Sequence, residues 1–264
     1  MKIAVAGKGG VGKTLICGTL ARLLARDGYS VLAVDADPAM NLAFSLGIPA
    51  TEVSKIVPLT ENEELISSRT KAPYGSTFGA LVNLTPTVDD ITEKYGIVGP
   101  DRVRLLVMGT VRSGGSGCMC PADSLVRALI RHITLVEKDV VVMDMEAGLE
   151  HLGRATVRGF NVLLCVVEPG LQSIETAARI KRLANDINVK EVVGVGNKVT
   201  SKRDVKSITE SLEKIGMPLL CSIPFDKNII RADSSRAAPI DYAPSSKAIT
   251  AIKDLEKTLL TRYT

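Results

Sequence analysis

The stretch Met1-Lys-Ile-Ala-Val-Ala-Gly-Lys-Gly-Gly-Val-Gly-Lys-Thr14 opens the chain. Its apolar residues 3–6 predict a short buried strand, which stops at Gly7 and is followed by a glycine loop and an apolar helix. Residues 7–14 match the spacing G-x-x-x-x-G-K-T in this strand–loop–helix order. Glycines let backbone N–H groups point inward and approach a phosphate closely, and the helix directs its positive end at the same place. The stretch therefore predicts a nucleotide-binding phosphate loop.

Two side chains at the end of the loop carry groups that a nucleotide requires. Lys13 offers a mobile cation to the β- and γ-phosphates, and the Thr14 hydroxyl offers an oxygen ligand to Mg²⁺. A glycine loop that only turns a strand into a helix would need neither group. The predicted nucleotide-binding residues here are Gly7, Lys8, Gly9, Gly10, Val11, Gly12, Lys13, Thr14 and Leu15.

A second lysine, Lys8, directly follows the first glycine of the loop. In the form GKGGVGKT, the loop resembles the deviant Walker A signature of the MinD, ParA and nitrogenase-iron-protein group. In that group, this lysine reaches across a dimer interface to the nucleotide of the partner. The resemblance implies an ATPase that acts as an ATP-sandwiched homodimer, with Lys8 and Lys13 among its catalytic residues. The alternative is an ordinary solvent-exposed lysine.

Composition indicates a globular α/β protein. The 264 residues suit one large domain, and 45% hydrophobic against 23% charged residues leave ample material for a core. Aromatic residues make up only 3% and Trp is absent, so the core must be aliphatic, as in a parallel sheet buried on both faces. The net charge of +4 is too small to indicate nucleic-acid binding.

Cysteine content and hydropathy bear on the compartment. The five cysteines are an odd number without a secretory signal pattern, which favours a reducing cytoplasm over a disulfide framework. No stretch reaches the roughly 18 apolar residues that a membrane span needs. We therefore expect a cytoplasmic protein that does not enter the membrane.

Strand and helix patterns alternate along the chain. This order predicts the α/β class: a P-loop NTPase of the deviant Walker A type, with one doubly wound, mostly parallel sheet and helices on both faces. We expect a single domain over residues 1–264, with a lid or insertion at about 48–100 that carries short helices or a hairpin. The predicted strands are residues 3–6, 29–34, 103–108, 139–144, 161–167, 192–196 and 219–223, and the predicted helices include residues 15–27, 122–136, 172–186 and 246–260.

Carboxylates follow the second strand, in the sequence DADPAMN. The carboxyl ends of strands form the rim where open α/β sheets bind ligands. The segment is similar to switch I of the same group, which implies that Asp37 orients or activates the attacking water and that Asp35 and Asn41 support the loop. Asp35 and Asp37 are also expected in the Mg²⁺ shell. The alternative is a helix-capping and turn cluster.

The buried strand DVVVMD ends in a third carboxylate, Asp144, with Gly148 four residues later. An apolar run that closes on Asp and is followed by glycine is the Walker B and switch II arrangement. Asp144 is therefore expected in the Mg²⁺ shell, and the glycine N–H is placed to sense the γ-phosphate.

Two later strand ends are expected to hold the base. The resemblance implies that Asn197 reads the adenine edge through its amide, which offers both a donor and an acceptor. Lys198 follows it, and the backbone around Pro224 and Phe225 is expected to flank the base.

Cys118 and Cys120 flank one residue in a loop rich in Gly and Ser. Cysteines two apart in an extended segment point the same way, so both sulfurs can reach one ion. Two thiolates rarely complete a tetrahedral site, but a homodimer would supply four. Against this, free cysteines are commonly inert and buried.

Five motifs taken together resemble the CooC family, the accessory ATPases for nickel insertion into carbon monoxide dehydrogenase; a related factor, AcsF, serves acetyl-CoA synthase. The motifs are GKGGVGKT, DADP, SGCMCP, DMEAGLEH and NKV, in this order. The resemblance implies that Cys118 and Cys120 of two subunits hold Ni²⁺ or Zn²⁺ at the dimer interface, and that the partner is apo-carbon monoxide dehydrogenase or acetyl-CoA synthase. Leu15 departs from the family, where Thr or Ser is common.

Two other functions of the wider group compete with this one. A positioning ATPase of the MinD or ParA type would need a membrane-targeting or DNA-binding element, whereas residues 246–260 have a core-type stripe and no basic run is present. A reductase like the nitrogenase iron protein would need a cysteine just after switch II. Residues 146–159 contain none.

Overall fold

The computed structural model describes residues 1–37, 39–72, 83, 85–109, 121–135, 140–145, 159–186 and 189–263. In this part of the chain, eight strands form one sheet in the order β3-β4-β2-β5-β1-β6-β7-β8. All neighbouring strands are parallel except β3, which runs antiparallel to β4. The strands are β1 (Lys2–Gly7), β2 (Val31–Ala36), β3 (Ile97–Val98), β4 (Arg104–Val107), β5 (Val140–Met145), β6 (Val162–Val167), β7 (Val192–Val199) and β8 (Leu219–Pro224).

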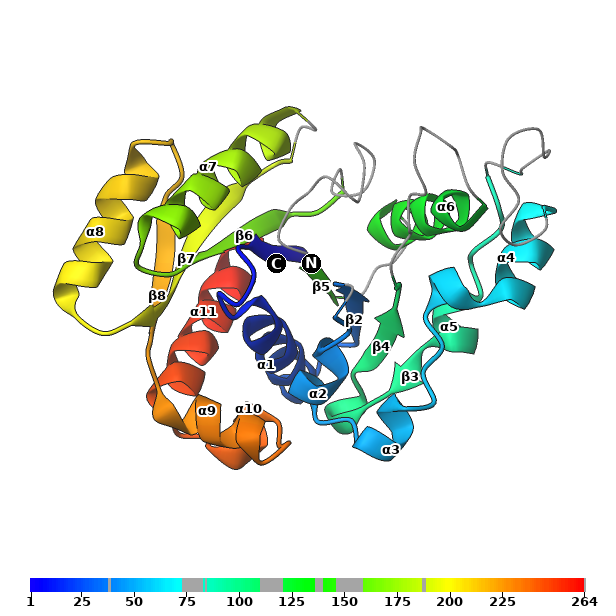
Figure 1. Ribbon diagram of the computed structural model, residues 1–264, viewed down its shortest axis with the longest axis horizontal. Coiled ribbons are helices and arrows are strands. Elements are labelled where there is room, and N and C mark those ends of the chain that lie inside the picture. The colour runs from blue at the N-terminus through cyan, green and yellow to red at the C-terminus, as the bar shows by residue number, and fades with distance from the viewer. Residues whose placement is uncertain are drawn as a thin grey trace.

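Helices cover both faces of this sheet, with α6 and α7 on one side and α1 and α11 on the other (Figure 1). The predicted doubly wound, mostly parallel α/β fold is therefore confirmed. The helices are α1 (Lys13–Arg26), α2 (Leu42–Leu46), α3 (Ala50–Val53), α4 (Glu63–Thr70), α5 (Ile91–Tyr95), α6 (Pro121–Leu135), α7 (Leu171–Asp186), α8 (Lys202–Glu213), α9 (Lys227–Ser234), α10 (Pro239–Tyr242) and α11 (Lys247–Tyr263), with 3₁₀ turns η1 (Leu59–Glu61) and η2 (Pro100–Arg102).

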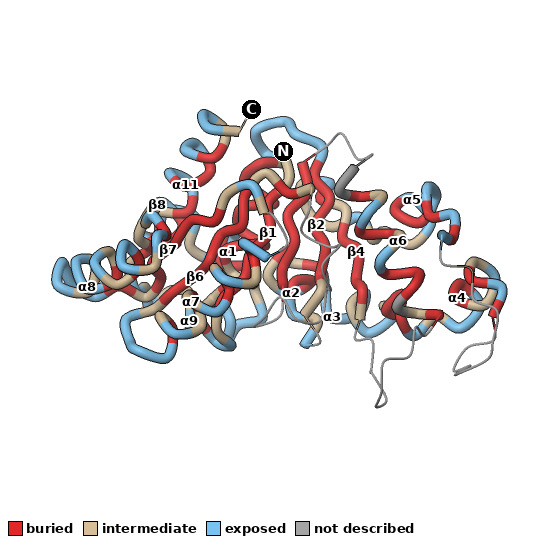
Figure 2. The backbone as a smooth tube through the Cα atoms, turned by 90° about the horizontal axis from the view of Figure 1, so that it is seen from above, coloured by how far each residue is buried: buried red, intermediate tan, exposed pale blue. Residues whose placement is uncertain are grey.

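The core has two layers because side chains alternate along each strand. In β1, Ile3 and Val5 face the cluster that includes α1 and α11, whereas Ala4 and Ala6 face the cluster that includes α6 and α7. Figure 2 shows the buried strands running between the partly exposed helices. This double burial explains the near-continuous apolar runs of the sequence.

Residues 48–100 include a sheet edge as well as short helices. Residues 73–82 and 84 of this segment lie outside the described residues. The described part contains α3, α4 and α5, and α4 packs against α6. It ends in β3, whose two residues pair with β4. A two-residue strand carries too little alternation to be seen in a sequence.

The largest differences from the predicted strand bounds are in β2 and β7. β2 begins at Val31 rather than residue 29, because the Tyr29 N–H still donates to the Leu24 carbonyl of α1 (3.1 Å). β7 extends to Val199 rather than residue 196, and its register with β8 is irregular between Gly196 and Val199. This bulge places two predicted site residues inside the strand instead of after it.

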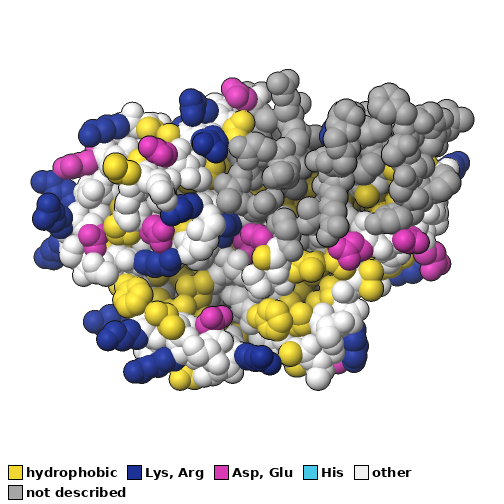
Figure 3. Space-filling model, viewed as in Figure 1, with side chains coloured by type: hydrophobic (Ala, Val, Ile, Leu, Met, Phe, Trp, Pro, Cys, Tyr) yellow, Lys and Arg dark blue, Asp and Glu magenta, His cyan; other side chains and the backbone are white. Residues whose placement is uncertain are grey.

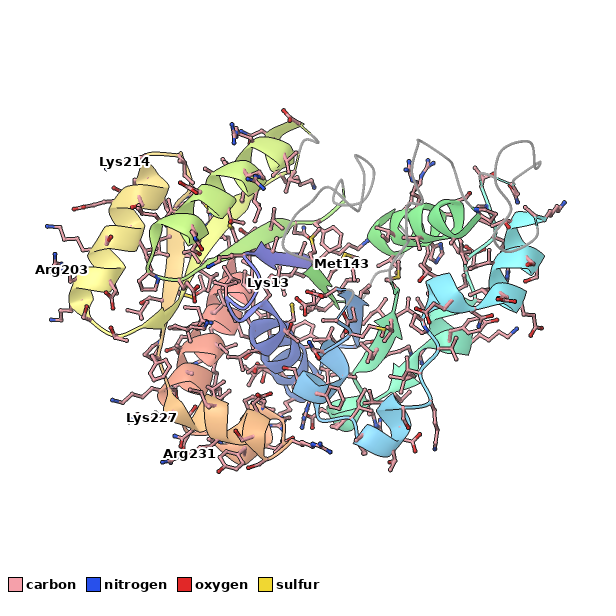
Figure 4. The ribbon with its side chains drawn as sticks, viewed as in Figure 1. Lys13, Met143, Arg203, Lys214, Lys227 and Arg231 are labelled. Carbon is pink, nitrogen blue, oxygen red and sulfur yellow. The ribbon has the colours of Figure 1, made fainter. Side chains whose placement is uncertain are left out.

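Three further features concern the chain ends, the surface charge and the helices as possible membrane spans. The N- and C-terminal ends lie close together in both backbone views (Figures 1 and 2). Basic side chains gather over α8 and α9 with acidic ones among them, and Arg203, Lys214, Lys227 and Arg231 point outward there (Figures 3 and 4). None of the helices in the described ranges combines the length and apolarity needed to cross a membrane.

Candidate functional site

The phosphate loop joins the central strand β1 to α1, as predicted, although α1 already begins at Lys13. Two glycines are required by their surroundings. A Cβ on Gly7 would lie 2.4 Å from the carbonyl oxygen of Val166 in β6. Gly12 has φ +99°, and a Cβ there would lie 2.2 Å from the Asn197 amide nitrogen. Larger residues would therefore push the loop away from β6 and β7.

Lys13 lies at the start of α1 beside this loop (Figure 4) and is almost fully buried. Its ammonium group donates to the Lys8 carbonyl at 3.4 Å, the long end of the hydrogen-bond range. The side chain is thus held over the loop by a weak contact that a phosphate oxygen can replace.

Two predicted carboxylates are brought together under the loop. Asp35 of β2 and Asp144 of β5 are paired residues of neighbouring parallel strands, and both are fully buried. Asp35 accepts hydrogen bonds from the backbone N–H groups of Asp37 (3.1 Å) and Leu42 (3.0 Å). By contrast, neither carboxylate oxygen of Asp144 has a hydrogen bond of good geometry among the described residues, although the Thr14 hydroxyl and the Cys17 thiol lie near this carboxylate.

Burial is the main reason that both carboxylates hold their protons more tightly than usual. It raises the pKa of Asp35 to about 7, and the neighbouring Asp144 adds to this rise. It also raises the pKa of Asp144 to about 6, against the opposing effects of the Thr14 hydroxyl and the Lys13 ammonium group. A buried carboxylate without a partner is unfavourable unless a cation neutralises it.

These residues fit Mg²⁺, which prefers oxygen ligands and binds through few carboxylates together with substrate phosphates. Asp144 has two uncommitted oxygens, and the Thr14 hydroxyl lies close enough to affect its pKa. The oxygens of Asp35 are instead used to hold the following loop. The donor set therefore favours Asp144 and Thr14 over Asp35 as ligands.

The segment after β2 is ordered by carboxylates. Asp35 caps α2 by accepting from Leu42, and the Asp37 side chain accepts from the Ala39 N–H (2.9 Å) in a tight turn. Asn41 precedes α2 but makes no side-chain capping bond. The predicted support of this loop thus comes from Asp35, while Asp37 stays partly exposed at the sheet edge.

Asn197 and Lys198 both reach the phosphate loop from the bulge in β7. The Asn197 amide donates to the Val11 carbonyl (2.7 Å) and is buried. The Lys198 ammonium donates to the Gly10 carbonyl (2.7 Å), from a backbone with φ +55°. Sequence reasoning did not anticipate these bonds to the loop; adenine recognition by Asn197 stays a prediction.

The remaining predicted residues divide into two groups. Pro224 ends β8, and the Phe225 N–H donates to the Val199 carbonyl (2.9 Å), so both lie at the same edge as Asn197, with Phe225 partly exposed. Cys118 and Cys120 lie outside the described residues, as does the segment after Asp144 that includes Gly148. Cys17 and Cys165 are buried, and Cys221 is partly buried.

Glu168 is a site residue that sequence reasoning missed. It follows β6, and its carboxylate pairs with Lys198 (2.9 Å) and with Lys8 (3.8 Å). Like Asp35 and Asp144, it is a carboxylate at a strand's carboxyl end, which is the signal that could have found it.

Comparison with known proteins identifies the class of this chain. Residues 2–240 match the family described as "CobQ/CobB/MinD/ParA nucleotide binding domain". The chain therefore belongs to this family of nucleotide-binding proteins, and it is an ATPase.

Solved structures share the fold. The ParA family ATPase from Chlorobium tepidum TLS superposes with a TM-score of 0.72 over 97% of each chain at 19% identity. The septum site-determining protein MinD of Pyrococcus horikoshii OT3, complexed with Mg-ADP, has a TM-score of 0.68 over 98% of this chain and 95% of its own, also at 19% identity.

Sequence comparison places the chain more narrowly. It is 44% identical over 247 residues to the carbon monoxide dehydrogenase accessory protein CooC of Rhodospirillum rubrum, covering 94% of this chain and 92% of that protein. An uncharacterized ATP-binding protein of Methanocaldococcus jannaschii is 43% identical over 236 residues, covering 88% of each. The predicted resemblance to the CooC family is thereby confirmed.

Proposed function

We propose that this protein is a maturation ATPase that assists the insertion of nickel into carbon monoxide dehydrogenase or acetyl-CoA synthase. The observation that carries the proposal is the 44% identity, across nearly the whole chain, to a carbon monoxide dehydrogenase accessory protein. The site agrees with it: a phosphate loop with the additional Lys8 leads the chain, and SGCMCP supplies a pair of thiols.

ATP binding closes two subunits on each other in this proposal. Gly7 to Thr14 hold the phosphates, Lys13 neutralises them, and Lys8 reaches the nucleotide of the partner. Mg²⁺, held by Asp144 and Thr14, supplies positive charge at the phosphates. Asp37, which is partly exposed just after the carboxyl end of β2, orients the attacking water, while Asp35 holds the backbone of Asp37. Adenine lies by Asn197 and Phe225.

Nickel, or zinc in its place, is the cargo of the protein. Cys118 and Cys120 of two subunits form a four-thiolate site, which suits a soft or borderline metal. Closure by ATP and opening after hydrolysis change the distance between the two pairs, so the nucleotide state controls whether the metal is held or released to the apo-enzyme. The reaction takes place in the cytoplasm, where the thiols stay reduced.

The double substitution Cys118→Ser with Cys120→Ser tests the metal site. We expect it to abolish binding of Ni²⁺ or Zn²⁺ at one ion per two chains, measured by metal analysis after gel filtration, because a hydroxyl is a poor ligand for these metals. ATP hydrolysis should continue, since the phosphate loop is unchanged. Cys221→Ser is the matched control, because this cysteine lies in β8 and outside the SGCMCP motif. Full metal stoichiometry in the double variant would rule out the proposed site.

A further inference from the structure

Glu168 is fixed in position by its own backbone. It directly follows β6, and its backbone N–H donates to the hydroxyl of Ser173 in α7 (3.0 Å). β6 lies between β1 and β7 in the sheet, so its carboxyl end faces the phosphate loop on one side and the β7 bulge on the other. The carboxylate of Glu168 therefore emerges between two loops that both carry site residues.

Two lysines meet at this carboxylate. The Lys198 ammonium binds one oxygen at 2.9 Å and, on its other side, the Gly10 carbonyl at 2.7 Å. The Lys8 ammonium lies 3.8 Å from the second oxygen. Lys198 thus ties Glu168 to the phosphate loop, and this leaves the second oxygen as a counter-charge for Lys8.

The contact with Lys8 is the weaker of the two, and it lies at an open edge. The Lys8 side chain is 37% exposed and that of Glu168 is 23% exposed. Leu171, three residues further on, is 83% exposed, so the described structure leaves the start of α7 next to Glu168 open. Partly exposed ion pairs of this length bias a side chain without locking it.

We propose that Glu168 is a positioning residue that holds Lys8 against its own subunit before the dimer forms. Lys8 cannot pair with Glu168 and also reach the phosphates of a partner's nucleotide, so closure exchanges a carboxylate for a phosphate at this ammonium group. Glu168 then opposes dimerisation at low ATP and competes for Lys8 when the phosphates leave. The inference rests on the proposed ATP-sandwiched homodimer.

The substitution Glu168→Gln tests this role, because the amide can still accept from Lys198 but carries no charge for Lys8. Dimer formation is followed by light scattering against the concentration of a slowly hydrolysed ATP analogue with Mg²⁺, and ADP affinity is measured by calorimetry. We expect the dimerisation midpoint to fall about two- to fivefold, the range of an exposed ion pair. This fall should exceed any change in ADP affinity, whereas a merely structural defect would weaken both.

Two further variants make the result decisive. Glu175→Gln removes the same charge from an exposed position on α7 and should leave the midpoint unchanged. Glu168→Asp keeps the negative charge, and its midpoint should stay close to that of the unsubstituted chain. A normal midpoint in this variant together with a lowered midpoint in Glu168→Gln shows that the lost charge, and not a folding defect, causes the change. An unchanged or higher midpoint in Glu168→Gln overturns the inference. An unsubstituted chain that stays monomeric at every analogue concentration instead overturns the homodimer itself.

Discussion

At the scale of one residue, Asp144 shows most clearly how the sequence provides a metal ligand. It is fully buried, and neither carboxylate oxygen has a hydrogen bond of good geometry in the described structure. Its neighbour Asp35 is equally buried but binds two backbone N–H groups. Two carboxylates in paired positions of adjacent strands therefore have different tasks: Asp35 holds the following loop, and Asp144 is available to bind a cation.

Asp144→Asn should separate these effects. We expect Mg²⁺-dependent ATP hydrolysis, measured by phosphate release, to fall by about 100-fold or more, because the metal loses its anionic ligand. The nucleotide-free protein should be as stable or more stable, by up to about 2 kcal/mol at pH 8 in urea unfolding, because the penalty of a buried charge disappears. A clear loss of stability at pH 8 would show that Asp144 has a structural partner.

Sequence reasoning located these carboxylates because each follows an apolar run, and the parallel fold brings the strand ends to one edge. It also found the phosphate loop, where spacing along the chain is itself the signal. It missed the contacts of Asn197 with Val11 and of Lys198 with Gly10, which join residues 186 and 188 positions apart. No local pattern encodes such pairs. The β7 bulge that aims them arises from pairing with β8.

At the scale of elements, α11 carries an unusual group in its packed face. Its apolar residues, including Ile252, Leu255 and Leu259, are buried as the predicted stripe required, and the helix packs against α1. Glu256 lies among them at 1% exposure, and its Oε1 has no hydrogen-bond partner in the described structure. Burial is the main cause that raises its pKa to about 7; Asp27 adds to the rise, and Lys253 and Lys257 oppose it.

Glu256 should make stability depend on pH. Since its folded-state pKa lies above the ordinary value of 4.5, the folded chain keeps the proton longer than the unfolded chain. Stability from this group is therefore present below pH 4.5 and is lost as the pH rises to about 7. We expect Glu256→Gln to raise the free energy of unfolding by on the order of 1–2 kcal/mol at pH 8, and by much less at pH 4.5.

Urea unfolding of both chains across this range checks the prediction. A gain that is equal at both pH values would show that Gln acts through packing rather than through the lost charge. ATP hydrolysis serves as a control. It should be unchanged in Glu256→Gln, because the substitution is confined to the core under α11, on the face of the sheet opposite α7.

At the scale of the whole molecule, one edge of the sheet collects every described group that the proposed cycle uses. β1 leads into the phosphate loop there, β5 brings Asp144, and β2, β6 and β7 end with or are followed by Asp35, Glu168 and Asn197, whose contacts are given above. The additional lysine lies beside Glu168. Both chain termini lie together in the two backbone views (Figures 1 and 2). The proposed coupling between this edge and Cys118 and Cys120 requires two copies of the chain, because one copy supplies only two thiols in that motif.

The most direct test is a metal titration of the reduced protein under anaerobic conditions, with molar mass followed by light scattering, in the presence and absence of ATP and Mg²⁺. The account predicts that Ni²⁺ or Zn²⁺ saturates at one ion per two chains and that the mass doubles as the site fills. Dimerisation with ATP but without any bound metal would contradict the metallochaperone function while leaving the ATPase intact.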